Sequence, residues 1–169
     1  LYPIFVSLIF IPSVFIYYNA SALIHSLWYL VTSIIGTIIG IIIGILINKL
    51  IKERGENADL NDIDVSNIKD MSHLFDDYRL TIKKIDISKW DVSNVENMFA
   101  MFNGLFNFDC NLGEWDVSNV TNMERMFDHC MEFNGEGLEN WNTEKVKNMT
   151  NMFNNCYYLN KHGKPKWYK

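Results

Sequence analysis

The first 48 residues of this 169-residue chain contain no Asp, Glu, Lys or Arg. All 35 residues of these types therefore lie in residues 49–169. A water-soluble domain exposes charged side chains along most of its length, so this absence argues against a single soluble domain. The chain also lacks a basic excess, because its formal net charge is −5. Nucleic-acid binding needs a basic face, so we predict no nucleic-acid partner.

Cysteine is scarce, and motifs for catalysis are absent. Three cysteines exclude a disulfide-dense scaffold, and no Cys-x-x-Cys pair is present for zinc. The chain has no G-x-S-x-G motif and no glycine-rich phosphate loop. We therefore predict no catalytic residues, no metal site and no cofactor, and we predict that the protein is not an enzyme.

The uncharged segment contains two apolar runs, at about residues 4–18 and 26–47. A helix rises about 1.5 Å per residue, so the second run is long enough to span a hydrocarbon core of about 30 Å. The first run is shorter and contains Pro12, so a signal sequence stays open as an alternative to a first membrane helix. We predict a transmembrane α-hairpin within residues 1–50, an integral membrane location and contact with membrane lipid.

Three glycines recur at every fourth position of the second run: Gly36, Gly40 and Gly44. In a helix this spacing places them on one stripe, where the absence of side chains lets two helices approach closely. The stripe predicts helix association, either with the first run or with a second copy of the chain as a homo-oligomer.

Basic residues follow the second run directly: Lys49, Lys52 and Arg54. The positive-inside rule then places the rest of the chain on the cytoplasmic side, with the cell surface as the alternative. Residues 51–59 form a juxtamembrane linker in this interpretation.

The charged part of the chain is a sequence repeat of about 26 residues. Four blocks align on Ile63, Trp90, Trp115 and Trp141. Each block contains apolar residues at the spacing i, i+3, i+4, which is typical of one face of a short helix. The recurring positions include Met98, Met123 and Met149, and Phe75, Phe102, Phe127 and Phe153. An Asx residue precedes each Met position, where it predicts a helix N-cap: Asp70, Asn97, Asn122 and Asn148.

One repeat cannot bury its Met, Phe and Trp face alone, but stacked repeats bury these faces as continuous ladders. We expect one short helix and one short strand per repeat. The predicted fold is therefore a transmembrane α-hairpin followed by a small α/β solenoid, leucine-rich-repeat-like, with four repeats in residues 60–167 and a tail at 168–169.

Two aligned columns have alternative chemical interpretations. Cys130 and Cys156 share one slot of successive repeats, and we favour core packing over a disulfide. Acidic residues align at Asp64, Asp91 and Asp116. Because Asp often caps a turn through its own backbone, we favour this structural role over calcium binding.

The run W-D-V-S-N-V-T-N-M-x-x-M-F at residues 115–127 resembles the BspA-like leucine-rich-repeat surface proteins. That group includes repeats first catalogued as a mycoplasma domain of unknown function. The resemblance covers about residues 60–167. It implies a leucine-rich-repeat-like solenoid with a role in adhesion or protein interaction, commonly at cell surfaces, and it carries over no catalytic residues.

The leading functional hypothesis is a membrane-anchored repeat protein whose solenoid binds other proteins. The alternative hypothesis is a membrane component, in which the glycine-striped hairpin oligomerises and is itself the functional part.

Overall fold

The computed structural model describes residues 42–47, 49–55, 57–75 and 84–168. The chain divides into two compact units, Leu1–Ile35 and Gly36–Lys169. All described residues belong to the second unit.

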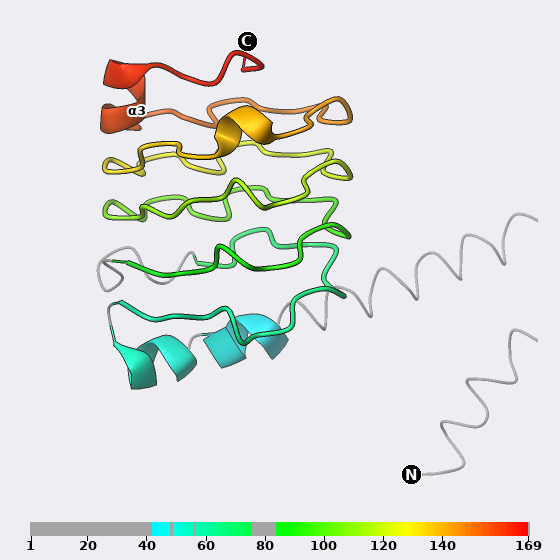
Figure 1. Ribbon diagram of the computed structural model, residues 1–169, viewed down its shortest axis with the longest axis vertical. Coiled ribbons are helices and arrows are strands. Elements are labelled where there is room, and N and C mark those ends of the chain that lie inside the picture. Colours follow the sequence, from blue (N-terminus) through cyan, green and yellow to red (C-terminus); the bar gives the residue numbers. More distant parts are fainter. Residues whose placement is uncertain (1–41, 48, 56, 76–83, 169) are drawn as a thin grey trace, which may run out of the picture. The chain divides into compact units, whose positions relative to one another are not determined.

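Successive sequence repeats lie one above another as irregular coils (Figure 1). Isolated parallel bridges join equivalent positions of neighbouring repeats: Asp59–Asp86, Asp70–Asn97, Asn97–Asn122 and Asn122–Asn148. We call this arrangement the repeat stack, and we call its coils rungs 1 to 4, which contain Ile63, Trp90, Trp115 and Trp141 respectively. The bridges stay isolated, so the described residues contain no β-strand and no sheet.

The segment after each Asx residue is a turn and not the predicted helix. In rung 2 the amides of Met98, Ala100 and Phe102 each donate to a carbonyl of rung 3, at 2.9 Å. A helix would use these amides for its own i→i−4 bonds, so a helix and the stacked coil exclude each other. A positive φ in every rung helps to aim these N–H groups at the next rung. It occurs at His73 (56°), Ala100 (52°), Arg125 (54°) and Asn151 (57°).

Side chains of the same kind form columns inside the repeat stack. The rings of Trp90, Trp115 and Trp141 are stacked with centroids 6.5 Å apart at each step. In a second column, the ring of Phe102 lies 5.5 Å from Phe75 and 5.3 Å from Phe127. Burial of these apolar faces between rungs is the main stabilising contribution.

These observations correct the predicted fold class. The helices of the described residues are the segments 42–47 and 49–54, the 3-10 helix η2 (Leu138–Asn140) and α3 (Tyr157–His162). None of them lies in a Met/Phe block. The predicted leucine-rich-repeat-like α/β solenoid is therefore wrong, because neither its helices nor its strands form. Each rung uses its backbone groups for bonds to neighbouring rungs and for tight turns.

One face of the helical segments 42–47 and 49–54 packs against the repeat stack. Ile47 and Ile51 are buried, and Ile43 and Leu50 pack against the same core. This i, i+4 spacing defines a single apolar helix face. The segment therefore covers the hydrophobic core at its N-terminal end.

This packing also corrects the predicted location. Within the described ranges, no helix is long and apolar enough to cross a lipid bilayer. The end of the predicted span, residues 42–47, instead contacts the protein core. A helix face buried in protein needs the same uncharged residues as one in lipid, which is why hydropathy predicted a span. The integral membrane location, with repeats on the cytoplasmic side, is contradicted by this finding. The runs at 4–18 and 26–41 lie outside the described residues.

Candidate interaction surface

The structure places the predicted ladder residues inside the repeat stack. Phe75, Phe102, Phe127 and Phe153 have no exposed surface, and neither do Met98 and Met123. Met149 of rung 4 is only partly buried. The Nε1 of each Trp also donates to a carbonyl of the preceding rung, as from Trp115 to Ile87 at 3.1 Å. These residues therefore build the scaffold and are not available to a ligand.

The predicted glycine stripe is described only at Gly44. A Cβ atom at this position would lie 3.8 Å from the side chain of Leu74, so Gly44 faces rung 1. Gly36 and Gly40 lie outside the described residues.

Sequence reasoning missed a further aromatic column. Phe108 and Phe133 are fully buried, and their rings lie 5.5 Å apart. Each also lies 4.3 Å from a ring of the Phe column, Phe102 and Phe127 respectively. Their separation of 25 residues, close to the repeat period, is the signal that could have found them.

The Asx residues before the Met positions form a side-chain ladder. The amide of Asn122 donates to Oδ1 of Asn97 at 3.1 Å, and Asn97 donates to Oδ1 of Asp70 at 3.0 Å. Each Oδ1 also accepts the backbone N–H two residues later, as Asn97 does from Phe99. These groups satisfy each other in a partly buried position, so their role is structural.

An exposed column of carboxylates runs across the rungs at Asp64, Asp91 and Asp116. The carboxylate of Asp91 accepts hydrogen bonds from the backbone N–H of Ser93 at 3.0 Å and from its hydroxyl at 2.6 Å. These bonds hold the pKa of Asp91 below its usual value, although the charges of Asp64 and Asp116 oppose this shift. The three carboxylates are therefore ionised, fixed in position and mutually repulsive.

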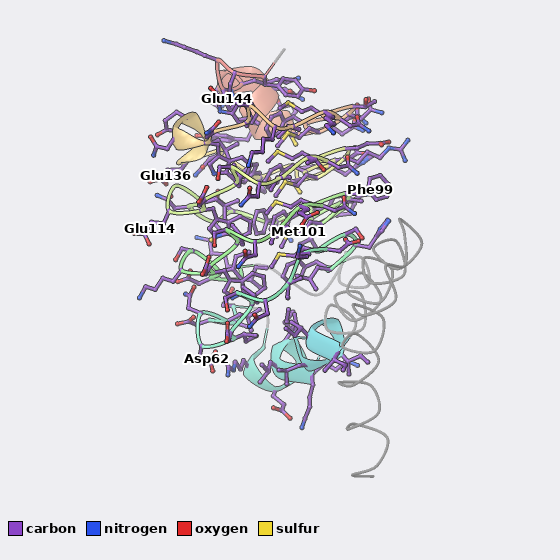
Figure 2. All side chains as sticks on the ribbon, turned by 90° about the vertical axis from the view of Figure 1, so that its right-hand side faces the viewer. Asp62, Phe99, Met101, Glu114, Glu136 and Glu144 are labelled. Carbon is purple, nitrogen blue, oxygen red and sulfur yellow. The ribbon has the colours of Figure 1, made fainter. Side chains whose placement is uncertain are left out.

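Further acidic residues lie beside this column. Asp91, Glu114 and Asp116 line one groove together with Lys89. Figure 2 shows Asp62, Glu114 and Glu136 along one side of the repeat stack, with Phe99 on the other side in this view. We call this surface the acidic side; it consists of Asp62, Asp64, Asp91, Glu114, Asp116 and Glu136, of which Asp62 is paired with Arg54.

The charges of the repeat region are unevenly distributed along the sequence. Residues 57–140 contain 17 acidic and six basic residues, a net charge of −11. Residues 141–169 contain one acidic and six basic residues, a net charge of +5. The field of the first three rungs therefore attracts cations, and that of the last rung attracts anions.

Comparison with protein families decides the assignment. A family model described as "Mycoplasma protein of unknown function, DUF285" matches residues 47–167, which is more than two-thirds of the chain. The chain belongs to this family. Comparisons with curated proteins and with solved structures found no match.

The match to the DUF285 family begins inside the helical segment and not at the first repeat. It starts at residue 47, and Ile47 is buried in the core that the rungs share. Residues 51–59, predicted as a linker, contribute Ile51 and Ala58 to the same core. The helix end is therefore part of the DUF285 unit.

Metal-ligating groups and cysteine thiols are two further kinds of site that can be examined in the described residues of the DUF285 chain. No group of three or more His, Cys, Asp or Glu side chains there could hold a metal ion. Cys130 and Cys156 are buried, unpaired thiols that donate to carbonyls of Phe102 and Phe127. Burial raises the pKa of Cys156 to about 12. Both thiols therefore stay protonated and unreactive, as core residues do.

Proposed function

We propose that the chain is a BspA-like repeat protein whose repeat stack mediates protein–protein interaction or adhesion, without catalysis. Its acidic side would bind a basic, extended segment of another protein. The observation that carries this proposal is the column of Asp64, Asp91 and Asp116, which Ser hydrogen bonds hold in a fixed, ionised geometry.

The physical argument rests on preorganisation. Neighbouring hydrogen-bonded segments lie about 4.8 Å apart, so the column presents negative charges at regular short intervals. The side chains of a flexible acidic surface must become ordered when a partner binds, whereas the carboxylates of this column are ordered before binding. A basic partner also relieves the repulsion between Asp91 and its neighbours. Rigid repeat scaffolds with regular exposed faces are commonly used for such extended recognition.

The test measures binding of a fluorescent peptide about 12 residues long, in which Lys alternates with Ser, to the full chain. The double variant Asp91→Asn and Asp116→Asn keeps both Ser hydrogen bonds but removes two charges. Because exposed ion pairs are individually weak, we expect binding to weaken about threefold to tenfold.

A matched control removes two charges from a different groove. Asp109→Asn and Glu132→Gln change residues that line a polar groove crossing the rungs, together with Lys84 and Tyr158. We expect this variant to bind the peptide as the unchanged chain does. If both variants weaken binding equally, the effect comes from net charge and not from the acidic side. Unchanged binding in the variant Asp91→Asn and Asp116→Asn would refute the proposal.

A further inference from the structure

The polar groove that crosses the rungs is a second candidate site, separate from the acidic side. Its lining includes Asn107 and Asp109 of rung 2, Glu132 and Asn134 of rung 3, and Tyr158 of α3. Its volume is about 590 Å³, within the range of about 300–1,000 Å³ that is typical of small-ligand sites. We call it the polar groove.

Amides and carboxylates alternate in the polar groove. Asn107 and Asp109 of rung 2 occupy the positions that Glu132 and Asn134 occupy in rung 3. Each carboxylate therefore has an amide beside it within its own rung and another in the neighbouring rung, about 4.8 Å away. The polar groove thus offers hydrogen-bond donors and acceptors side by side.

Two of these side chains are held in position by backbone amides. Oδ1 of Asp109 accepts the N–H of Asn134 at 3.4 Å, and Oδ1 of Asn134 accepts the N–H of Glu136 at 2.6 Å. Oδ2 of Asp109 and Nδ2 of Asn134 make no hydrogen bond to any described residue. A fixed acceptor therefore lies beside a fixed donor.

The other two side chains keep their polar groups available to a ligand. Asn107 and Glu132 are exposed, and among the described residues neither side chain has a hydrogen-bond partner. Elsewhere in the repeat stack, Asn side chains bond to a neighbouring rung, as Asn94 does to Ser66 O at 2.9 Å. The polar groove thus differs from surfaces where Asn amides contribute to the stacking.

An aromatic ring on α3 completes the polar groove. Tyr158 is 41% exposed, and its ring stacks on that of His162 with the centroids 4.1 Å apart. Nδ1 of His162 lies within hydrogen-bond distance of Tyr158 O, at 2.9 Å, and the amide of Tyr158 donates to Met131 O at 3.0 Å. One ring face is therefore covered, and the ring is ordered before a ligand binds.

These groups select the chemistry of the ligand. Each hydroxyl group of a sugar both donates and accepts, so neighbouring hydroxyls match a fixed donor beside a fixed acceptor. The apolar C–H face of a sugar ring can pack on the ring of Tyr158. The carboxylates of Asp109 and Glu132 disfavour an acidic ligand, and Lys84, which also lines the polar groove, disfavours a strongly basic one.

We propose that the polar groove binds a short, uncharged saccharide chain. Asp109 and Asn134 bond neighbouring hydroxyl groups of one sugar. Asn107 and Glu132 bond those of an adjoining sugar, and the ring of Tyr158 packs on a C–H face. This site shares no residue with the acidic side, so the inference does not rest on the proposed function.

The test is an NMR titration of the labelled full chain with uncharged tetrasaccharides. Maltotetraose and cellotetraose represent polysaccharides, a mannose tetrasaccharide represents the glycans of glycoproteins, and tetragalacturonate is the acidic control. We expect at least one uncharged tetrasaccharide to shift the side-chain amide signals of Asn107 and Asn134, with a Kd of about 1 mM or below. The compound that binds identifies the source of the saccharide.

Variants of Tyr158 test the contribution of the ring. Tyr158→Ala should weaken binding about threefold to tenfold, whereas Tyr158→Phe keeps the ring and should bind nearly as the unchanged chain does. The matched control is Tyr157→Ala, because Tyr157 is the neighbouring, more exposed tyrosine and lines a different groove. This control should leave binding unchanged.

A second pair of variants tests the polar contacts without changing the packing of α3. Glu132→Ala removes an exposed side chain that bonds to no described residue, so it should preserve the fold and weaken binding about twofold to tenfold. Glu144→Ala removes the same charge outside the polar groove and should leave binding unchanged.

Several outcomes would overturn the inference. One is the absence of any shift at Asn107 and Asn134 with every uncharged tetrasaccharide at about 10 mM. Others are equal binding of tetragalacturonate and equal weakening by each variant and its control. Shifts that only the lysine-rich peptide causes would assign the polar groove to a protein partner and would also overturn it.

These outcomes are separable from those of the proposed function. If the saccharides fail while the lysine-rich peptide still responds to Asp91→Asn and Asp116→Asn, the inference is wrong and the proposed function stands. If only the lysine-rich peptide fails, the acidic side is not the interaction surface.

Discussion

Replacing Phe127 by Ala should destabilise the repeat stack more than most single substitutions. The ring of Phe127 is fully buried and lies within 4.3–6.3 Å, centroid to centroid, of Phe102, Phe108, Phe133, Phe153 and Trp141. It therefore joins the Phe and Trp columns to the additional aromatic column and connects rung 3 with both neighbouring rungs.

The magnitude follows from this burial. Truncation of a buried Phe to Ala costs about 3–5 kcal/mol, since transfer and cavity contributions add. Domains of this size are stable by about 5–15 kcal/mol, so the loss is a large fraction of the total. The midpoint of thermal unfolding should fall by roughly 10–20 °C.

The assay is urea denaturation of the variant and of a control, Phe99→Ala. Phe99 is half-exposed, and its ring contact is with His73 at 4.8 Å, so we expect its loss to cost less than about 1.5 kcal/mol. Similar midpoints for the two variants, with the same denaturant dependence, would refute the stacked aromatic core.

Three further predictions concern single side chains. Ser93→Ala should raise the pKa of Asp91 in an NMR titration, because the Ser hydroxyl bond is the largest cause of its lowering. Above the pKa that Asp91 has in the unfolded chain, its ionised carboxylate stabilises the fold, and this contribution is lost as the pH falls through the lower pKa of the folded state. Ser93→Ala should therefore make the free energy of unfolding fall less steeply as the pH is lowered. Arg125→Gly should stabilise the chain by about 0.5–1 kcal/mol in denaturation, because glycine adopts a φ of 54° without strain, whereas Arg125→Ala should not. Cys130 and Cys156 should react with iodoacetamide at pH 8 only when urea unfolds the chain; labelling of both in the native state would contradict their burial.

The repeat and its apolar positions could be recognised from the sequence. Trp90, Trp115 and Trp141 recur every 25 or 26 residues, and their rings lie 6.5 Å apart at each step. A side chain that recurs in every repeat is buried against its equivalent in the neighbouring repeat, and the recurrence itself can be seen in the sequence alone.

The backbone conformation of each rung could not be predicted in this way. The spacing i, i+3, i+4 of Met98, Met101 and Phe102 suits a helix, but a turn with positive φ at Ala100 also buries these three side chains. The choice depends on whether the amides bond within the segment or to the next rung, and the next rung lies about 25 residues away. Propensity is a weak guide when tertiary bonds compete for the same amides.

The candidate interaction surface is only partly visible in the sequence. The charge contrast between residues 57–140 and 141–169 is present in the composition. The grouping of Glu114 with Asp91 and Asp116 in one groove is not, because it depends on how the rungs stack.

The most direct test of the repeat stack is a scalar coupling across the hydrogen bonds between rungs, measured by NMR on the labelled full chain. The stacked rungs predict a coupling between the amide nitrogen of Met98 and the carbonyl carbon of Asn122, and another between Met123 and Asn148. Couplings from the amide of Phe102 to the carbonyl of Met98, together with none between rungs, would show a helix in each repeat and would contradict the stacked fold.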